Sequence, residues 1–142
     1  EAPYIGGDIR FDRSFGTRPM PQLEIAGHGT YDVAEGRRLV KAIEACGVDI
    51  GHRCGGKARC TTCRVRFVDG EPDVMTKAEH AKLAERGLLG EARLSCQIVA
   101  HAAMHVEVLM RVSEQGWTDP GPEPADTVEP EAAWFPKDDL EA

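Results

Sequence analysis

The chain has 142 residues, of which 42% are hydrophobic and 29% charged, an ordinary composition for one globular domain. No apolar run approaches the ~20 residues of a membrane-spanning helix, so we expect no membrane span. No signal-peptide pattern opens the chain, and a processed or trimmed start stays open. The net charge of −7 is concentrated near the end, because residues 113–142 hold nine acidic residues and one lysine, which leaves +1 for residues 1–112.

The five cysteines indicate the compartment. An odd number, with four of them clustered, favours a reducing environment over a disulfide scaffold, and we expect a cytoplasmic protein. Nucleic-acid binding is not expected, since the arginines are not interleaved with aromatic residues and the overall charge is negative.

The chain divides into three segments. Residues 1–20 contain paired glycines and scattered arginines without helical or strand periodicity, and we expect them to form an arm. Residues 21–112 carry alternating and helical hydrophobic patterns, and we expect them to form the folded domain. Residues 113–142 are acidic and hold five of the nine prolines and both tryptophans, so we expect a separate tail.

The folded domain is predicted to open with a hairpin and a helix. Weak alternation over residues 22–26 and 30–34, around a Gly-His-Gly turn, predicts two strands. The apolar residues of 37–46 fall on one helical face, and Gly47 is well placed to end that helix. Cys46 lies on the apolar face, so it is predicted to be a small buried core residue and not a functional thiol.

The second half of the domain is predicted to contain a helix and three more strands. Thr76 and Glu79 have the spacing of a capping box, which predicts a helix ending near residue 86, with His80 facing solvent. The strands are expected at residues 63–68, 94–100 and 104–110. This order of elements is α+β, and it is compatible with a small sheet that grips a helix.

The tail carries three aromatic residues, Trp117, Trp134 and Phe135, among its carboxylates. We hypothesise that it folds back on its own domain or clasps a partner chain, with the aromatic side chains as anchors and the carboxylates against arginines. The alternative is a solubilising tail without a binding role.

Three cysteines, Cys54, Cys60 and Cys63, lie within ten residues, and Cys96 follows 33 residues later. Thiolates are soft ligands, and sets of four hold zinc or iron–sulfur clusters. Zinc ribbons usually supply two C-x2-C pairs, whereas only Cys60 and Cys63 have that spacing here. The nearest pattern is the plant-type [2Fe–2S] spacing C-x4-C-x2-C…C, lengthened by one residue.

With this motif and its flanking residues 45–50 and 93–97, the segment from about residue 22 to 110 resembles a [2Fe–2S] ferredoxin of the β-grasp fold. The resemblance is closest to the bacterial and adrenodoxin-like branch, whose loop has five residues between the first two cysteines. It implies a [2Fe–2S] cluster with four ligands, Cys54, Cys60, Cys63 and Cys96. It also implies that the first two hold the iron nearer the surface and the last two hold the inner iron.

The other residues of the loop suit an anionic cluster. Gly55 and Gly56 allow positive φ and a close approach of backbone N–H groups to sulfur, while Thr61 and Thr62 can add hydroxyl donors. Six cationic or ionisable side chains lie within twelve residues of Cys54: His52, Arg53, Lys57, Arg59, Arg64 and Arg66. They are predicted to raise the reduction potential, unless they form only a solvated face.

We therefore expect a one-electron carrier and not an enzyme, since the remaining His, Asp and Glu residues show no acid–base or nucleophile constellation. Its expected partners are redox proteins, a reductase and an acceptor enzyme, which dock at the rim formed by residues 52–66. Two alternatives stay open. One is an electron-transfer subunit of a larger redox complex, and the other is a zinc-stabilised β-grasp interaction module.

Overall fold

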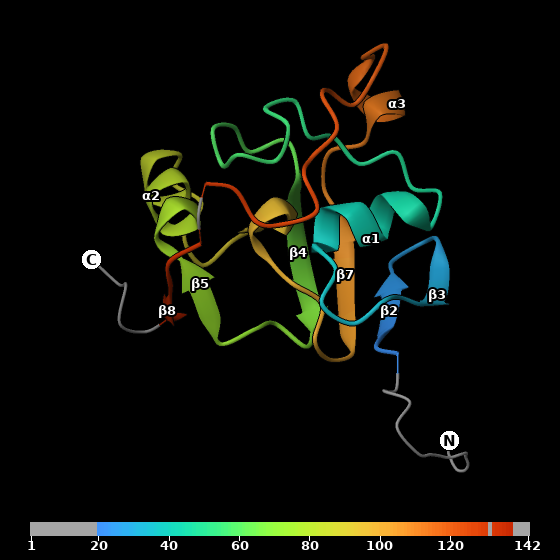
Figure 1. Cartoon of the computed structure of the whole chain (residues 1–142). Coiled ribbons are helices and arrows are strands. Elements are labelled where there is room, and N and C mark those ends of the chain that lie inside the picture. The colour runs from blue at the N-terminus through green and yellow to red at the C-terminus, as the bar shows by residue number, and fades with distance from the viewer. Residues whose placement is uncertain (1–19, 131, 138–142) are drawn as a thin grey trace.

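The computed structural model describes residues 20–130 and 132–137 of the chain. Its main layer is a five-stranded mixed sheet with the strand order β3-β2-β7-β4-β6 (Figure 1). In that order the strands are Gly29–Asp32, Gln22–Ile25, Met104–Val108, Arg64–Asp69 and Arg93–Leu94. Strands β2 and β7 run parallel, and every other neighbouring pair of this sheet is antiparallel.

Helix α1 (Leu39–Ala45) lies across one face of this sheet (Figure 1). Its buried face packs on the inward side chains of the sheet to form the core, which includes Leu39, Val40, Ile43, Leu23, Ile25, Val65 and Val106. Gly47 follows the helix with φ of +90°, a left-handed conformation that glycine adopts without strain. The mixed sheet with one main helix on its face has the predicted α+β, β-grasp arrangement.

Cys46 lies at the C-terminal cap of α1. The sequence predicts a buried residue here, but Cys46 is only partly buried and packs against the edge of the core. The difference arises because the helix ends one residue earlier than its apolar stripe, so the thiol lies where the chain turns away.

Helix α2 (Lys77–Glu85) begins with half of the predicted capping box. The Thr76 hydroxyl accepts a hydrogen bond from the backbone N–H of Glu79 at 3.0 Å. The Glu79 carboxylate does not reach back to Thr76 but is fully buried against Arg93. The prediction that His80 faces solvent is wrong, because this side chain is half-buried and its Nε2 atom has no hydrogen-bond partner among the described residues.

The expected strand over residues 94–100 is also wrong. Regular strand structure covers only β6, and the chain then forms a 3-10 turn, η1 (Ser95–Gln97), which contains Cys96. After this turn Ile98 is extended and Val99 forms an isolated antiparallel bridge with Arg38. The Ser95 hydroxyl and the Ser95 backbone N–H both donate to the Cys63 carbonyl oxygen, at 2.8 and 3.2 Å, and these bonds turn the chain towards the first three cysteines. An apolar run of this length does not distinguish a strand from a buried turn.

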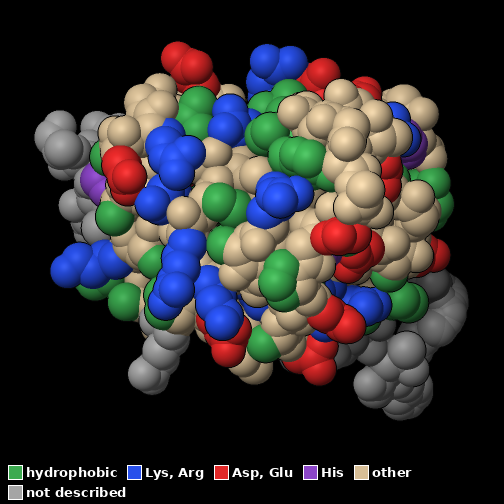
Figure 2. Space-filling model, turned by 90° about the horizontal axis from the view of Figure 1, so that it is seen from above, with side chains coloured by type: hydrophobic (Ala, Val, Ile, Leu, Met, Phe, Trp, Pro, Cys, Tyr) green, Lys and Arg blue, Asp and Glu red, His purple; other side chains and the backbone are tan. Residues whose placement is uncertain are grey.

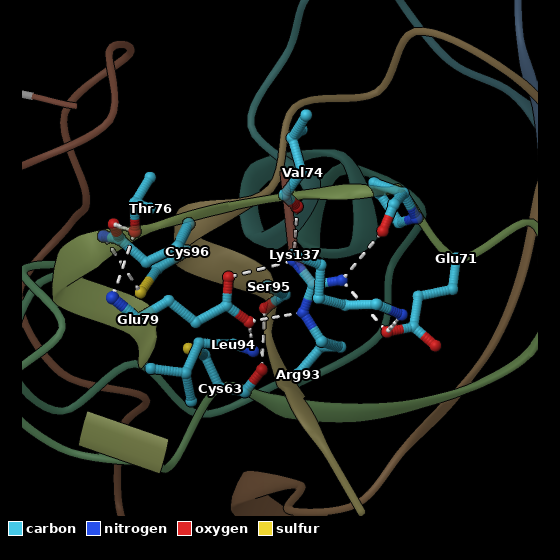
Figure 3. Close-up of polar contacts among 12 residues, drawn as sticks. Cys63, Glu71, Val74, Thr76, Glu79, Arg93, Leu94, Ser95, Cys96 and Lys137 are labelled. Atoms are coloured by element: carbon cyan, nitrogen blue, oxygen red, sulfur yellow. Dashed lines mark hydrogen bonds and ion pairs between the residues drawn. The ribbon is translucent and has the colours of Figure 1, made fainter. Parts of the chain in front are cut away.

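A buried ion pair joins α2 to β6 (Figure 3). Arg93 donates to both carboxylate oxygens of Glu79, at 2.7 and 3.1 Å, and the Leu94 backbone N–H donates to the same carboxylate at 2.8 Å. Burial raises the pKa of Glu79, and the bonds from Arg93 oppose that rise. Cys63 and Cys96 lie beside this pair, so the pair supports the segment that carries them.

The described part of the tail folds back on its own domain (Figure 1). After α3 (Val112–Gln115) the chain runs across the end of α1 and finishes as β8 (Trp134–Pro136), which pairs antiparallel with β5 (Val74–Thr76). We call residues 117–130 the strap. The arm, except for Met20, and the acidic residues 138–142 lie outside the described residues.

The aromatic residues and carboxylates of the tail follow the expectation only in part, since Glu114 pairs with Arg111 at 3.8 Å but none of the other described tail carboxylates pairs with a described arginine. Trp117 packs on Arg53, whose guanidinium carbon lies 4.8 Å from the ring centroid. Trp134 and Phe135 remain 40% and 37% exposed, so they join β5 through their backbone and are not buried anchors. Glu123 and Asp126 pair with Lys41, at 3.5 and 3.0 Å, and not with an arginine.

We predict that Glu79→Gln destabilises the protein by about 3 kcal/mol, because the substitution leaves Arg93 buried without its main partner. Urea unfolding followed by circular dichroism measures the loss. Glu85→Gln on the exposed side of the same helix is the matched control, and it should change the urea midpoint little. Equal midpoints for the two variants would contradict this account of the buried pair.

Candidate functional site

The loop between α1 and β4 folds around its own sulfur atoms. Gly55 and Gly56 have φ of +74° and +79°, as the sequence predicted, and Ala58 also has positive φ, at +60°. The turn at the glycines directs the Lys57 backbone N–H towards Cys54 Sγ, at 3.3 Å. Ala58 adopts a conformation that costs a non-glycine residue about 1 kcal/mol or more, so the loop holds strain that its other contacts must offset.

The four predicted ligands come together as two thiol pairs. The side chains of Cys54 and Cys60 are close enough to shift each other's pKa, and so are those of Cys63 and Cys96. The first pair is half-buried, whereas Cys63 and Cys96 are 2% and 0% exposed. The two pairs are neighbours, since the charge of Cys54 acts on Cys96. The fifth cysteine, Cys46, belongs to neither pair.

Within each pair, the pKa of one thiol is lowered and the pKa of the other is raised. The bond from Cys60, assisted by the backbone N–H groups of Arg59 and Lys57, lowers the pKa of Cys54 to about 4. The bond to Cys54 and burial raise the pKa of Cys60. In the inner pair, the bond from Cys63 lowers the pKa of Cys96, and the bond to Cys96 and burial raise the pKa of Cys63. The site therefore favours negative charge on one sulfur of each pair, Cys54 and Cys96, and disfavours it on the other.

Further donors point at the sulfur atoms from around the site. The Thr62 hydroxyl lies 3.2 Å from Cys60 Sγ, and Gln97 Nε2 donates to Cys96 Sγ at 3.7 Å. Thr62 thus has the role expected of it. Thr61 does not, because its carbonyl oxygen accepts a hydrogen bond from Arg64 Nε, at 2.9 Å, and its hydroxyl contacts the same guanidinium group. Sequence reasoning missed Gln97, and its position directly after Cys96 is the one signal that could have pointed to it.

The cations of the loop differ in what they can reach. Lys57 and Arg59 are exposed and form no ion pair with the described residues. Arg66 pairs with Glu107, and Arg53 lies over Trp117. His52 is buried, and its Nε2 atom lies 2.8 Å from a Glu44 carboxylate oxygen. Figure 2, which views this end of the molecule, shows Lys and Arg side chains gathered on the face, with acidic side chains among and around them.

Arg38 is a second residue of this site that the sequence did not reveal. It precedes α1, its side chain is 1% exposed, and it donates to the carbonyl oxygens of Cys96, Gly56 and Ala125. It therefore joins the inner cysteine, the glycine turn and the strap. Nothing in the spacing of Arg37-Arg38 distinguishes it from an ordinary surface arginine.

The strap covers one side of the loop. The Pro120 carbonyl oxygen accepts from the His52 backbone N–H at 2.8 Å, and the backbone of Gly121 lies directly against Arg53. Pro122 and Pro124 follow, over Gly55 and Gly56 respectively. Farther on, the Glu129 carbonyl oxygen accepts from Gln97 Nε2 at 2.7 Å. The loop is therefore enclosed on the strap side and open at Lys57 and Arg59.

This arrangement suits a two-iron cluster. It provides two adjacent cysteine pairs, N–H and hydroxyl donors to sulfur, and glycines where the backbone must approach closely. Among the described residues, no group of three or more His, Cys, Asp or Glu side chains is arranged to hold a single metal ion.

Comparison with known proteins identifies the family. A family model for the 2Fe-2S iron-sulfur cluster binding domain matches residues 23–101. The chain belongs to this family. A 2Fe-2S ferredoxin of Haemophilus influenzae is 34% identical over 101 residues, which cover 63% of this chain and 83% of the ferredoxin. The crystal structure of an ISC-like [2Fe-2S] ferredoxin from Pseudomonas putida JCM 20004 shares the fold, with a TM-score of 0.52 and 23% identity over 63% of this chain and 93% of that chain.

A longer protein contains a similar stretch. It is a component of the Na(+)-translocating NADH-quinone reductase of Chlamydia felis, and it is 34% identical over 79 residues, which cover 56% of this chain and 18% of that component. The chain thus matches about a fifth of the length of that relative.

The family settles two of the expectations. The domain belongs to a [2Fe–2S] cluster-binding family, and its role is electron transfer. The alternative of a zinc-stabilised module is therefore wrong. In the part of the chain that the structure describes, no helix is both long and apolar enough to span a membrane.

We predict that Gly121→Ala releases the strap from the loop. The added Cβ would lie 2.6 Å from both Arg53 Cα and the His52 carbonyl oxygen, at a φ of +115°, so we expect a loss of at least about 2 kcal/mol. Gly116→Ala is the matched control, because that glycine also has positive φ but has open space around it, and it should cost about 1 kcal/mol. Thermal unfolding measures both losses. Limited proteolysis should cut residues 117–130 faster in the Gly121 variant alone, and equal cleavage would contradict the contact.

Proposed function

We propose that Cys54, Cys60, Cys63 and Cys96 hold the [2Fe–2S] cluster. The observation that carries the proposal is the meeting of these four thiols as two neighbouring pairs, while Cys46 lies apart. The difference in burial supports an outer iron on Cys54 and Cys60 and an inner iron on Cys63 and Cys96. When bound, the cluster supplies the ability to gain and lose one electron.

The protein's own residues have three tasks in this proposal. Backbone and side-chain donors, such as the Lys57 N–H and the Thr62 hydroxyl, stabilise negative charge on the sulfur atoms. The core and the strap exclude water from the inner pair, and they leave the outer pair near the surface. The buried Glu79–Arg93 pair holds η1 in place, so that Cys96 remains beside Cys63.

We expect Cys96→Ser to lose the cluster or to hold it only weakly, because it removes one of the four thiolates. Cys46→Ser is the control and should keep the cluster. Iron and sulfide analysis, with EPR of the reduced protein during a redox titration, measures both. Equal loss from Cys46→Ser would show that the ligand set is misassigned.

We also propose that redox partners, a reductase and an acceptor enzyme, dock at the rim of residues 52–66. The strap covers the part of this rim at Gly55 and Gly56. The part that stays open lies at Lys57 and Arg59, which are exposed and lie next to the outer thiols. The free positive charge there favours an acidic partner surface and speeds its approach at low salt.

The charge of the rim can be tested with small inorganic oxidants of opposite sign. Lys57→Glu together with Arg59→Glu should slow electron transfer from the reduced protein to ferricyanide and speed transfer to hexaamminecobalt(III), each by a few-fold at low ionic strength. Stopped-flow absorbance measures the rates. Arg86→Glu, an exposed charge change at the end of α2, should alter neither rate appreciably. If that control matched the double variant, the rim would have no special role.

A second candidate is an electron-transfer module of a larger redox complex. It is favoured by the relatives in which the matched stretch is about a fifth of a longer reductase component. Sizing of the native protein in its source extract distinguishes a free carrier from a stable subunit.

The compartment and the domain limits complete the proposal. None of the five cysteines forms a disulfide, and four of them are assigned to the cluster, which favours a reducing compartment such as the cytoplasm. We place the ferredoxin-type domain at residues 21–112, with residues 113–142 as its covering tail. The contacts of the strap with His52, Arg38 and Gln97 support this division of roles.

A further inference from the structure

Two arginines in the described part of the chain are buried, and their surroundings differ. Arg93 is 4% exposed and pairs with the carboxylates of Glu79 and Glu71, at 2.7 and 3.1 Å. Arg38 is 1% exposed, and none of the described carboxylates pairs with it. The charge of Arg93 is therefore balanced by neighbouring side chains, whereas the charge of Arg38 is not.

The hydrogen bonds of Arg38 end on backbone carbonyl groups. Nε and Nη2 donate to the Cys96 carbonyl oxygen at 3.1 and 2.7 Å, Nη2 also donates to that of Gly56, and Nη1 donates to that of Ala125 at 2.7 Å. These four bonds give each nitrogen of the guanidinium group an acceptor, but the acceptors carry no net negative charge. A buried charge without an opposite charge is costly, so a counter-charge is expected nearby.

The proposed cluster site supplies that counter-charge. Cys96 contributes both the carbonyl oxygen that Arg38 binds and one of the four thiolates. Four covalent bonds separate these two atoms, so the guanidinium nitrogen lies within about 8 Å of the sulfur. A [2Fe–2S] cluster with four thiolates bears two negative charges when oxidised and three when reduced, so a cation at this distance favours the reduced form.

The strap closes this interaction off from water. Pro124 is buried over Gly56, and a Cβ added to Gly56 would lie 2.8 Å from Arg38 Nη2 and 2.9 Å from Pro124 Cβ. Lys41 holds the same stretch of the strap, donating to the Pro124 carbonyl oxygen at 2.9 Å. Because mobile ions do not reach the enclosed guanidinium group, its effect should resist screening by salt.

We propose that Arg38 is the buried counter-charge of the cluster and raises its reduction potential. The proposal rests on the ligand assignment above. It assigns to Arg38 a role that the exposed cations of the loop do not share, because their effect passes through solvent and weakens with salt.

The test is a redox titration of the cluster-loaded protein, followed by EPR. Arg38→Gln keeps hydrogen-bond donors but removes the charge, and it should lower the ratio of reduced to oxidised protein at a fixed potential by about three- to tenfold. Tenfold corresponds to about 59 mV for one electron. The shift should persist from low salt to about 1 M. Arg37→Gln, which removes the exposed neighbouring charge, should give a smaller shift that vanishes at high salt.

Arg38→Lys separates the effect of the positive charge from the effect of the guanidinium hydrogen bonds. It retains the charge but loses the fork that binds Cys96, so stability should fall while the potential stays close to that of the wild type. If Arg38→Gln does not assemble a cluster, the Arg38→Lys variant alone decides the test. A reduction potential equal to that of the wild type supports the proposal. A marked fall in its potential, or a failure to bind a cluster, contradicts the proposal. An unmoved potential in Arg38→Gln would also overturn it. Absence of a reduced [2Fe–2S] signal in the wild type would instead refute the ligand assignment.

Discussion

The guanidinium group of Arg38 connects the parts of the molecule that are distant in sequence. It binds carbonyl groups from the glycine turn, from the 3-10 turn with Cys96, and from the strap. These segments have little regular structure, and none of them could bury its backbone carbonyls without a donor. The planar guanidinium group donates to a carbonyl oxygen of each of the three segments, and this fixes their positions relative to one another beside the cysteine pairs.

The Glu79–Arg93 pair has a complementary function on the other side of the site. It neutralises charge within the protein and supports the β6 to η1 segment, whereas Arg38 donates to backbone carbonyl oxygens and pairs with no described carboxylate. Two buried arginines of similar exposure thus serve different ends because of their partners. Their burial is similar, so burial does not distinguish the two arginines. What distinguishes them is the acceptor, a carboxylate for Arg93 and backbone carbonyl oxygens for Arg38.

Short-range signals in the sequence are enough to predict much of this structure. The cysteine spacing, Gly55 and Gly56, and the apolar face of α1 each depend on residues close together in the chain, so they predict the loop and the main helix. The strand predicted around Cys96 is wrong because the bonds from Ser95 to Cys63, which turn the chain, join residues far apart in sequence. Arg38 and the strap escape prediction for the same reason: their contacts span 58 and 87 residues.

The strap covers one side of the cysteine loop, and this affects how electrons enter and leave the protein. With the strap lying over Gly55 and Gly56, the described residues leave the flank near Lys57 and Arg59 as the open approach to the outer thiols. In the docking arrangement proposed above, donor and acceptor share this flank and do not bind at the same time. Such a carrier works by visiting its partners in turn, and its turnover depends on how fast one leaves before the next arrives.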